Sequence, residues 1–216
     1  MRTPRIFISM GTPYTDAYAA FRDELERLLR DRCKVDPRII GRNEYPPGSP
    51  IHKIAEVMRT CDGVIIVAYE RKFVHEGIER RGGQDERKIE SATYTTPWNH
   101  IESAIAFSLR LPIYIIAQRG LVEEGLIETK VDWYVQKIEF TVQNLQRPEV
   151  FDSLEAWITE RVSAHAKRNR LALEGFPKLR LLELTVEEWT ILITLIVTSF
   201  GAGFWLAREL PNILPG

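Results

Sequence analysis

The stretch TTPWNHIESAIAFSLRLPIYII, Thr95 to Ile116, places a helix-like segment directly before a strand-like one and decides the fold class that we expect. Its first part is amphipathic, because Trp98 and Ile105 fall on one side of a helix with about 100° between successive residues. Its last part, Ile113 to Ala117, is a short apolar run typical of a buried strand. A helix that leads into such a strand is typical of α/β domains.

Glu102 falls on the apolar side of that helix, whereas Asn99, Ser103 and Phe107 fall elsewhere. A carboxylate on a packing face is unfavourable unless it is paired, hydrated in a cleft or shifted in pKa. Two interpretations remain open. Glu102 either reaches water or an arginine at the edge of the apolar side, or it faces a pocket.

The rest of the chain alternates strand-like and helix-like segments. The other expected strands are Arg5 to Met10, Lys34 to Ile40, Gly63 to Glu70 and Trp133 to Val142. The other expected helices are Asp16 to Arg32, Pro50 to Thr60 and Leu154 to Lys167. This order predicts a parallel sheet with right-handed crossovers and helices on both faces. Pro37 favours an edge position for its strand.

The polar segment Arg71 to Tyr94 contains a Gly-Gly pair and separates the third strand from the helix that carries Glu102. We expect a long loop here. Such loops serve as lids or interaction surfaces, or are solvated excursions.

Ligands of parallel α/β sheets bind beyond the carboxyl ends of the strands. A glycine after the first strand lets a ligand approach the backbone, and the start of the following helix, capped by Thr15 or Asp16, favours an anionic group such as phosphate. The candidate binding residues at this edge are Gly11, Thr12, Tyr14, Arg42, Tyr69, Glu70 and Trp98, with Glu102 beside them.

Composition excludes several classes of function. The 216 residues carry 29 basic and 30 acidic side chains, so the composition lacks the excess of basic charge that is typical of nucleic-acid-binding proteins. The two cysteines, Cys33 and Cys61, and four scattered histidines offer neither a disulfide framework nor the spacing of metal ligands, so we expect no metal site and a reducing compartment. The apolar run near the N-terminus is too short for a signal peptide.

The segment Trp189 to Ala207, WTILITLIVTSFGAGFWLA, contains no charged residue. As a helix it would be roughly 28 Å long, close to the hydrocarbon thickness of a bilayer of about 30 Å. We therefore expect a single transmembrane helix that contacts the lipid bilayer. Basic residues are concentrated before the segment and only Arg208 follows it, which predicts a cytoplasmic N-terminal domain on a C-terminal membrane anchor.

The expected organisation is thus a cytosolic α/β domain over residues 1–170, a juxtamembrane linker over 171–188, the transmembrane helix over 189–207 and a short tail over 208–216.

The stretch Pro4 to Gly120 resembles the nucleoside 2-deoxyribosyltransferase family. It shares the Gly-x-Pro-Tyr turn after the first strand, the strand CDGVIIVAYE and the glutamate-bearing helix that leads to LPIYIIA. This resemblance implies that Glu102 is the catalytic glutamate. The chain differs from the family at Thr96 and Ile54, near which the family carries aspartates.

The sequence WNHIE, Trp98 to Glu102, also resembles the Trp-x-x-x-Glu pattern of TIR domains. That resemblance implies a flavodoxin-like order of parallel strands, a catalytic role for Glu102 and cleavage of NAD, and TIR domains often self-associate. Both resemblances imply chemistry at an N-ribosyl bond, where a carboxylate stabilises or attacks the developing oxocarbenium ion.

We therefore expect an N-ribosyl hydrolase or transferase that acts on NAD or a related nucleotide in a bacterial defence or signalling setting. It is expected to form a homo-oligomer and to need no further cofactor. Two alternatives remain: a nucleotide sensor that clusters membrane helices without chemistry, and a TIR-like interaction module.

Overall fold

The computed structural model of the chain describes residues 3–42, 50–128 and 133–175, together with 189, 190, 194 and 198. The chain divides into two compact units, Met1–Asn169 and Arg170–Gly216. The sheets and both cavities considered below belong to the first unit.

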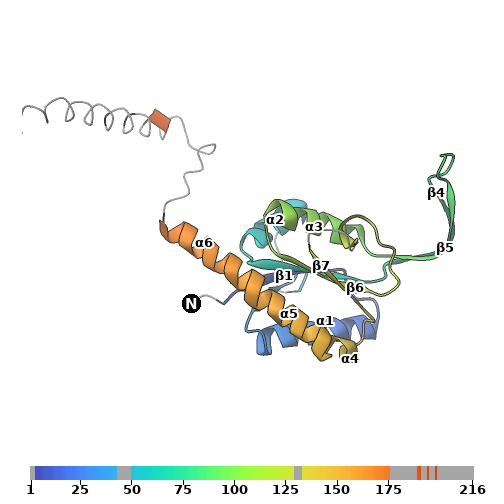
Figure 1. Cartoon of the computed structure of the whole chain (residues 1–216), viewed down its shortest axis with the longest axis horizontal. Helices are drawn as coiled ribbons and strands as arrows, with labels where there is room; N and C mark the ends of the chain where they lie inside the picture. Colours follow the sequence, from blue (N-terminus) through green and yellow to red (C-terminus); the bar gives the residue numbers. More distant parts are fainter. Residues whose placement is uncertain are drawn as a thin grey trace, which may run out of the picture. The chain divides into compact units, whose positions relative to one another are not determined.

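A five-stranded parallel sheet forms the centre of the first unit (Figure 1). Its strands are β1 (Arg5–Met10), β2 (Asp36–Arg38), β3 (Gly63–Ala68), β6 (Ile113–Gln118) and β7 (Tyr134–Ile138). They lie in the order β2-β1-β3-β6-β7, and every neighbouring pair is parallel. Counted along this sheet alone, the order is 2-1-3-4-5, as in flavodoxin-like folds. The expected parallel α/β sheet is confirmed, with the proline-containing strand β2 at an edge.

Helices cover both faces of this sheet. They are α1 (Asp16–Asp31), α2 (Pro50–Arg59), α3 (Pro97–Ser108), α4 (Val142–Leu145) and α5 (Pro148–Trp157). The last helix, α6 (Ser163–Gly175), begins in the first unit and ends in the second. A short 3-10 turn covers Gly125–Ile127, and the π-helical segment Ile158–Val162 joins α5 to α6. Thr15 caps α1 by accepting a hydrogen bond from the Tyr18 N–H at 3.2 Å.

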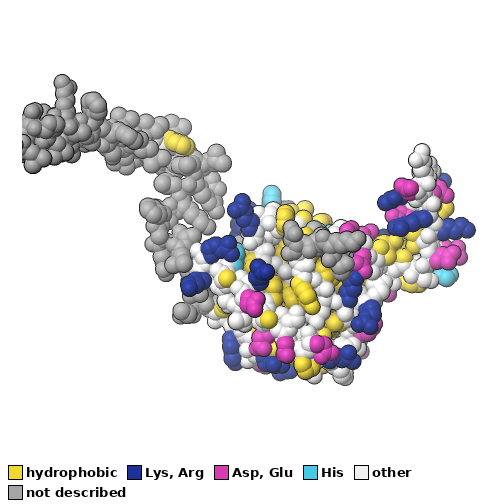
Figure 2. All heavy atoms as spheres, viewed as in Figure 1, with side chains coloured by type: hydrophobic (Ala, Val, Ile, Leu, Met, Phe, Trp, Pro, Cys, Tyr) yellow, Lys and Arg dark blue, Asp and Glu magenta, His cyan; other side chains and the backbone are white. Residues whose placement is uncertain are grey.

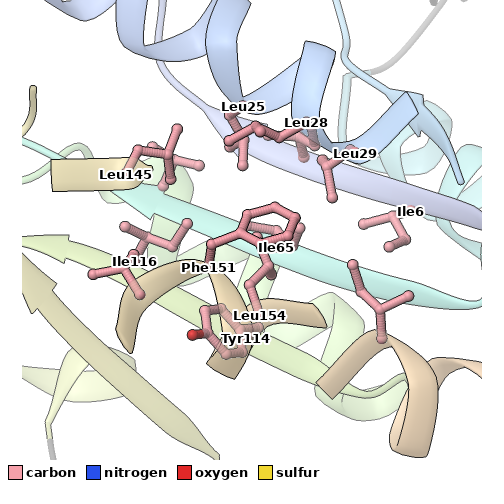
Figure 3. Packing of buried hydrophobic residues seen from close by; sticks show 14 of the residues in the cluster. Ile6, Leu25, Leu28, Leu29, Ile65, Tyr114, Ile116, Leu145, Phe151 and Leu154 are labelled. Carbon is pink, nitrogen blue, oxygen red and sulfur yellow. The ribbon is translucent and has the colours of Figure 1, made fainter. Parts of the chain in front are cut away.

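Successive strand residues point to opposite faces and so feed two separate cores. On one face, Ile65 and Ile116 pack with Phe151 of α5 and with side chains of α1 and α4 (Figure 3). On the other face, Ile66 packs with Met58 of α2 and with α3. The central strands are buried on both sides, which explains their uninterrupted apolar sequences.

The segment Arg71 to Tyr94 is a β-hairpin, so the prediction of a loop is wrong. β4 (Lys72–Glu79) and β5 (Arg87–Tyr94) pair antiparallel in a sheet of their own (Figure 1). Charged side chains of both signs lie along the hairpin (Figure 2), and even Phe73 and Ile78 are more than half exposed. Because neither face is buried, the sequence lacks the alternation of apolar and polar residues that marks a half-buried strand.

The prediction of a transmembrane helix is not supported. In the part of the chain that the structure describes, no helix is long and apolar enough to cross a membrane. Of the expected span, Trp189 to Ala207, all but Trp189, Thr190, Thr194 and Thr198 lies outside the described residues, as does the tail. The expected bilayer contact, C-terminal anchor and cytoplasmic orientation depended on this span and are withdrawn with it. A charge-free run establishes hydrophobicity, whereas a span also requires a continuous helix of sufficient length.

Gly63 allows α5 and the π-helical segment to approach β3. A Cβ at this position would lie 2.9 Å from Cγ2 of Val162 and 3.2 Å from a ring carbon of Trp157. Both neighbours are stiff side chains, so Gly63→Ala is expected to lower the free energy of unfolding by about 1 to 3 kcal/mol. Gly77→Ala in the hairpin is the control, because its Cβ would meet only an ordinary contact at 3.4 Å. Urea unfolding of both variants measures this, and an unchanged Gly63→Ala midpoint would contradict it.

Candidate functional site

A cavity of about 370 Å³ lies at the carboxyl ends of β1 and β3. This is the edge at which parallel sheets bind ligands. The loops after these strands, together with α2 and α3, supply its walls. The described residues that line it are Met10, Gly11, Thr12, Ile40, Pro50, Ile54, Tyr69, Arg71, Thr96, Trp98, Asn99 and Glu102.

Five of the expected site residues meet in this cavity: Gly11, Thr12, Tyr69, Trp98 and Glu102. The Tyr69 hydroxyl donates a hydrogen bond to the Gly11 carbonyl oxygen at 2.7 Å, which joins the turn after β1 to the end of β3. Trp98 is 43% exposed, so much of its indole is accessible to a ligand. The turn, the tyrosine and the indole therefore surround the space beside Glu102.

Three expected site residues do not line the cavity. Tyr14 lies outside it, and its hydroxyl donates to the Glu70 carbonyl oxygen at 2.8 Å. Glu70 itself is held by its backbone, because its N–H donates to Oε1 of Gln118 at 2.9 Å. Ligand binding beyond the carboxyl ends of parallel strands predicts the edge of the sheet at which a site lies. It does not predict which side chains at that edge point towards the ligand.

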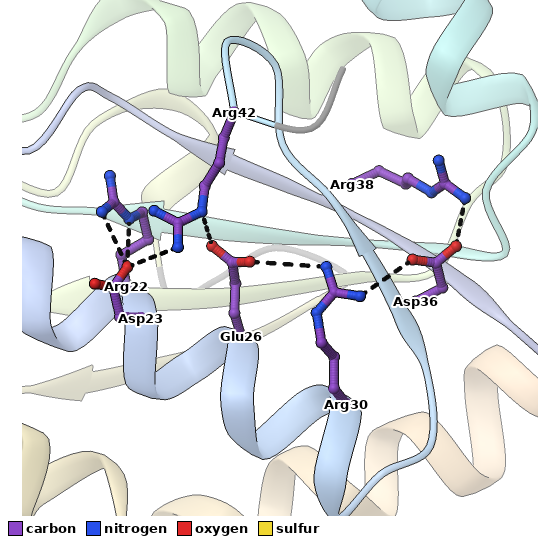
Figure 4. Close-up of polar contacts among 7 residues, drawn as sticks. All are labelled: Arg22, Asp23, Glu26, Arg30, Asp36, Arg38 and Arg42. Atoms are coloured by element: carbon purple, nitrogen blue, oxygen red, sulfur yellow. Dashed lines mark hydrogen bonds and ion pairs between the residues drawn. The ribbon is translucent and has the colours of Figure 1, made fainter.

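Arg42 is the third of these residues and belongs to an ion-pair network on α1 (Figure 4). Its guanidinium lies 2.6 Å from the Glu26 carboxylate and 3.0 Å from that of Asp23. The expected role of Arg42 in substrate binding stays a prediction. The carboxylates of Asp23 and the buried Glu26 on α1 attract this side chain, and it does not line the cavity.

Glu102 is only 8% exposed. Burial raises the pKa of its carboxyl to about 7, and a hydrogen bond from the Ser9 hydroxyl acts in the opposite direction. None of the described residues forms an ion pair with it. The interpretation of Glu102 as an edge residue paired with an arginine is therefore wrong, and the interpretation as a carboxylate facing a pocket holds.

A chain of hydrogen bonds leads from the start of α3 to this carboxylate. The Thr95 hydroxyl donates to Oδ1 of Asn99 at 2.7 Å, and Nδ2 of Asn99 donates to Oγ of Ser9 at 2.9 Å. The Ser9 hydroxyl then donates to Glu102. All four side chains are buried, so these bonds hold α3 against β1 and fix the position of the carboxylate.

The buried face of α3 differs from the expected apolar stripe. It consists of Asn99, Glu102, Ser103 and Ala106, while Trp98 lies more in solvent. Helical periodicity shows which residues share a face of the helix. It does not show which face packs against the sheet. The signal that sequence reasoning missed is the spacing of Asn99, Glu102 and Ser103, which places three polar groups along one side of the helix.

Arg71 is a cavity residue that sequence reasoning missed, because it begins the segment assigned to a loop. Its backbone N–H donates to the Tyr94 carbonyl oxygen at 2.8 Å, which closes the base of the hairpin. Its guanidinium forms no ion pair within the described residues. It favours the ionised form of Tyr69, although burial raises the pKa of that hydroxyl to about 12. A cation that pairs with no described carboxylate thus lies at the wall of the cavity.

In the described ranges, no group of three His, Cys, Asp or Glu side chains is placed so that it could hold a metal ion. Cys33 and Cys61 are free thiols.

No protein-family model matches the chain, and no curated protein is significantly similar to it.

Glu102→Gln is expected to stabilise the fold at high pH. The folded-state pKa of about 7 exceeds the ordinary value of 4.5, so the free energy of unfolding falls between about pH 4.5 and 7 and is level above. Glutamine removes this charge, and at pH 8 we expect a gain of about 1 to 3 kcal/mol. Urea unfolding of both proteins at pH 5 and pH 8 measures the difference. A difference independent of pH would contradict the assigned burial.

Proposed function

We propose that the chain hydrolyses the N-ribosyl bond of NAD or a related nucleotide, with Glu102 as the catalytic carboxylate. The observation that carries the proposal is one buried carboxylate, without a cationic partner among the described residues, in the wall of a cavity at the ligand edge of the sheet. The resemblances of this stretch to deoxyribosyltransferases and TIR domains point to the same chemistry.

The reaction requires stabilisation of positive charge at C1′ of the ribose. As the bond to nicotinamide breaks, its electron pair leaves with the base and C1′ acquires oxocarbenium character. A fixed carboxylate in a water-poor site stabilises that charge more strongly than water does. Water then adds to C1′ and releases a proton, which gives nicotinamide and ADP-ribose.

The small number of acidic side chains in the described lining of the cavity favours a substrate with a cationic base. Glu102 is the only acidic side chain among the described residues that line it. A neutral base leaves as an anion unless a general acid protonates it, which would require a second proton-donating group. The pyridinium of NAD leaves as neutral nicotinamide and needs no such group.

Size and charge also support a dinucleotide. A volume of about 370 Å³ lies at the lower end of the range for small-molecule sites and suits the nicotinamide riboside half of NAD. The exposed face of Trp98 offers a stacking surface for a planar ring. The guanidinium of Arg71 is suited to bind phosphate oxygens in a bidentate manner.

Loss of the carboxylate is expected to abolish turnover. Glu102→Gln should lower the rate of nicotinamide release by at least about 100-fold, whereas Glu90→Gln in the exposed hairpin should leave it unchanged. Because ionised Glu102 is the active form, kcat/KM of the natural sequence should rise about tenfold per pH unit up to about pH 7 and then level off. Full activity of Glu102→Gln would overturn the proposal.

Arg71 is expected to distinguish nucleotides from nucleosides. Arg71→Gln should raise KM for NAD by about tenfold or more and leave KM for nicotinamide riboside, which lacks phosphate, unchanged. Arg81→Gln at the hairpin tip is the control, because Arg81 is exposed and lines neither cavity. Equal effects of Arg71→Gln on both substrates would contradict a phosphate contact.

A second candidate function is nucleotide binding without chemistry. Ile54 and Thr96, near which deoxyribosyltransferases carry aspartates, both line the cavity, so its described lining has a single carboxylate. Calorimetry with NAD and with ADP-ribose, together with an assay for nicotinamide, separates the two functions. Binding of NAD without release of nicotinamide favours the binding module.

A further inference from the structure

A second cavity, of about 740 Å³, lies at the opposite end of the sheet, where β6 and β7 begin. The end of α3, the first residues of these two strands and the region from α5 to α6 form its walls. It shares no described residue with the cavity of Glu102. Nothing in the proposed hydrolysis uses it.

The charged side chains of this second cavity are mainly basic. Arg110, Arg161 and Arg168 line it, and none of them forms an ion pair with another described residue. Glu160 is the only acidic side chain in the described part of the lining. Three guanidinium groups against one carboxylate favour an anionic ligand.

A buried histidine adds a hydrogen-bond donor to these cations. His165 is 8% exposed and lines the cavity, with its Nδ1 3.3 Å from Nδ2 of Asn169. Burial lowers the pKa of the ring, and Arg168 acts in the same direction, whereas Asp62 opposes them. A neutral ring that accepts the amide at Nδ1 carries its hydrogen on Nε2. That nitrogen has no hydrogen-bond partner in the described part of the chain.

Aromatic rings form the rest of the wall. Phe107 and Trp133 meet edge to face with ring centroids 5.9 Å apart. Tyr134 lies on the other side of the sheet, against Tyr114 with ring centroids 5.4 Å apart, and borders the cavity on the same side as Trp157. Phe107 is 59% exposed and Tyr134 is 53% exposed, an unusual accessibility for large rings that border a hollow. Such rings offer stacking surfaces for a planar base.

Two irregularities of the backbone carry arginines into this wall. Arg110 has a φ of 56°, a left-handed conformation that costs a non-glycine residue about 1 kcal/mol and that glycine would adopt freely. Arg161 lies in the π-helical segment Ile158–Val162, and such segments are rare and frequent at functional sites. Both arginines thus lie at irregular backbone in the wall of this cavity.

We propose that this second cavity binds a nucleoside phosphate, with the phosphate held by Arg161, Arg168 and His165 and the base stacked on the exposed ring of Tyr134, which lies on the same side of the sheet. The guanidinium and imidazole N–H groups can bind any small anion. The adjacent aromatic ring favours an anion that carries a planar base. A volume of about 740 Å³ accommodates a mononucleotide. This site is independent of NAD cleavage.

Calorimetry of the full chain with AMP, adenosine and inorganic phosphate tests the proposal. AMP should bind at least tenfold more tightly than either of its parts. The double variant Arg161→Glu/Arg168→Glu should weaken AMP binding at least tenfold. Arg59→Glu/Arg81→Glu is the matched control, because it changes the net charge equally at exposed positions outside both cavities. Thermal unfolding verifies that both variants fold.

The imidazole resonance of His165 identifies the site at which AMP binds, because this ring lies far along the sheet from Glu102. AMP should shift this resonance and raise the pKa of the ring, and Glu102→Gln should leave both effects intact. Equal AMP affinity in the two double variants, or an unmoved His165 resonance, would overturn the proposal. Inorganic phosphate binding as tightly as AMP would overturn the assignment to a nucleotide. Neither readout depends on nicotinamide release.

Discussion

Burial of β3 and β6 on both faces is the constraint from which the rest of the architecture follows. Every residue of β3 is inaccessible to water, so the sheet needs a layer of helices on each side. Parallel neighbours then require crossover connections, which carry the chain from one end of the sheet to the other. The faces have no room for a ligand. Polar groups that converge can do so only at the two ends of the strands, and the two cavities lie there.

Two glutamates in the described part of the chain are buried, and their environments are opposite. Glu26 on α1 is 7% exposed, and its carboxylate pairs with Arg30 and Arg42 (Figure 4). Glu102 is buried to the same degree, but a single hydroxyl stabilises it. One hydrogen bond to a charged group contributes about 1.5 to 3 kcal/mol, less than the penalty for burying an unpaired charge. The pKa of Glu102 is raised because the penalty for burying its charge exceeds the stabilisation from this hydrogen bond. A buried carboxylate that pairs with no described cation can interact with a cationic ligand.

Sequence reasoning succeeded where burial controls the pattern. β1 has the expected bounds, Arg5–Met10, because its residues fill both cores, and Pro37 correctly indicated an edge strand. It failed where a segment is exposed to solvent, and where the position of a side chain depends on residues distant in sequence. The hairpin β4–β5 has no buried face to impose periodicity, and Arg71 was overlooked with it. The positions of Asn99 and Arg42 depend on partners distant in sequence, Ser9 and Glu26, which no local spacing reveals.

A single helix takes part in both cavities. α3 presents Glu102 to one and Phe107 to the other, five residues and about 7.5 Å apart along its axis. Its hydrogen bonds to β1 make it a rigid element with limited freedom to tilt. A helix held in this way keeps the two ends of the sheet separate, so an occupant of one cavity leaves the affinity of the other unchanged unless it displaces α3. If a ligand did displace the helix, thermodynamic reciprocity would make its effect on the other ligand equal in both directions.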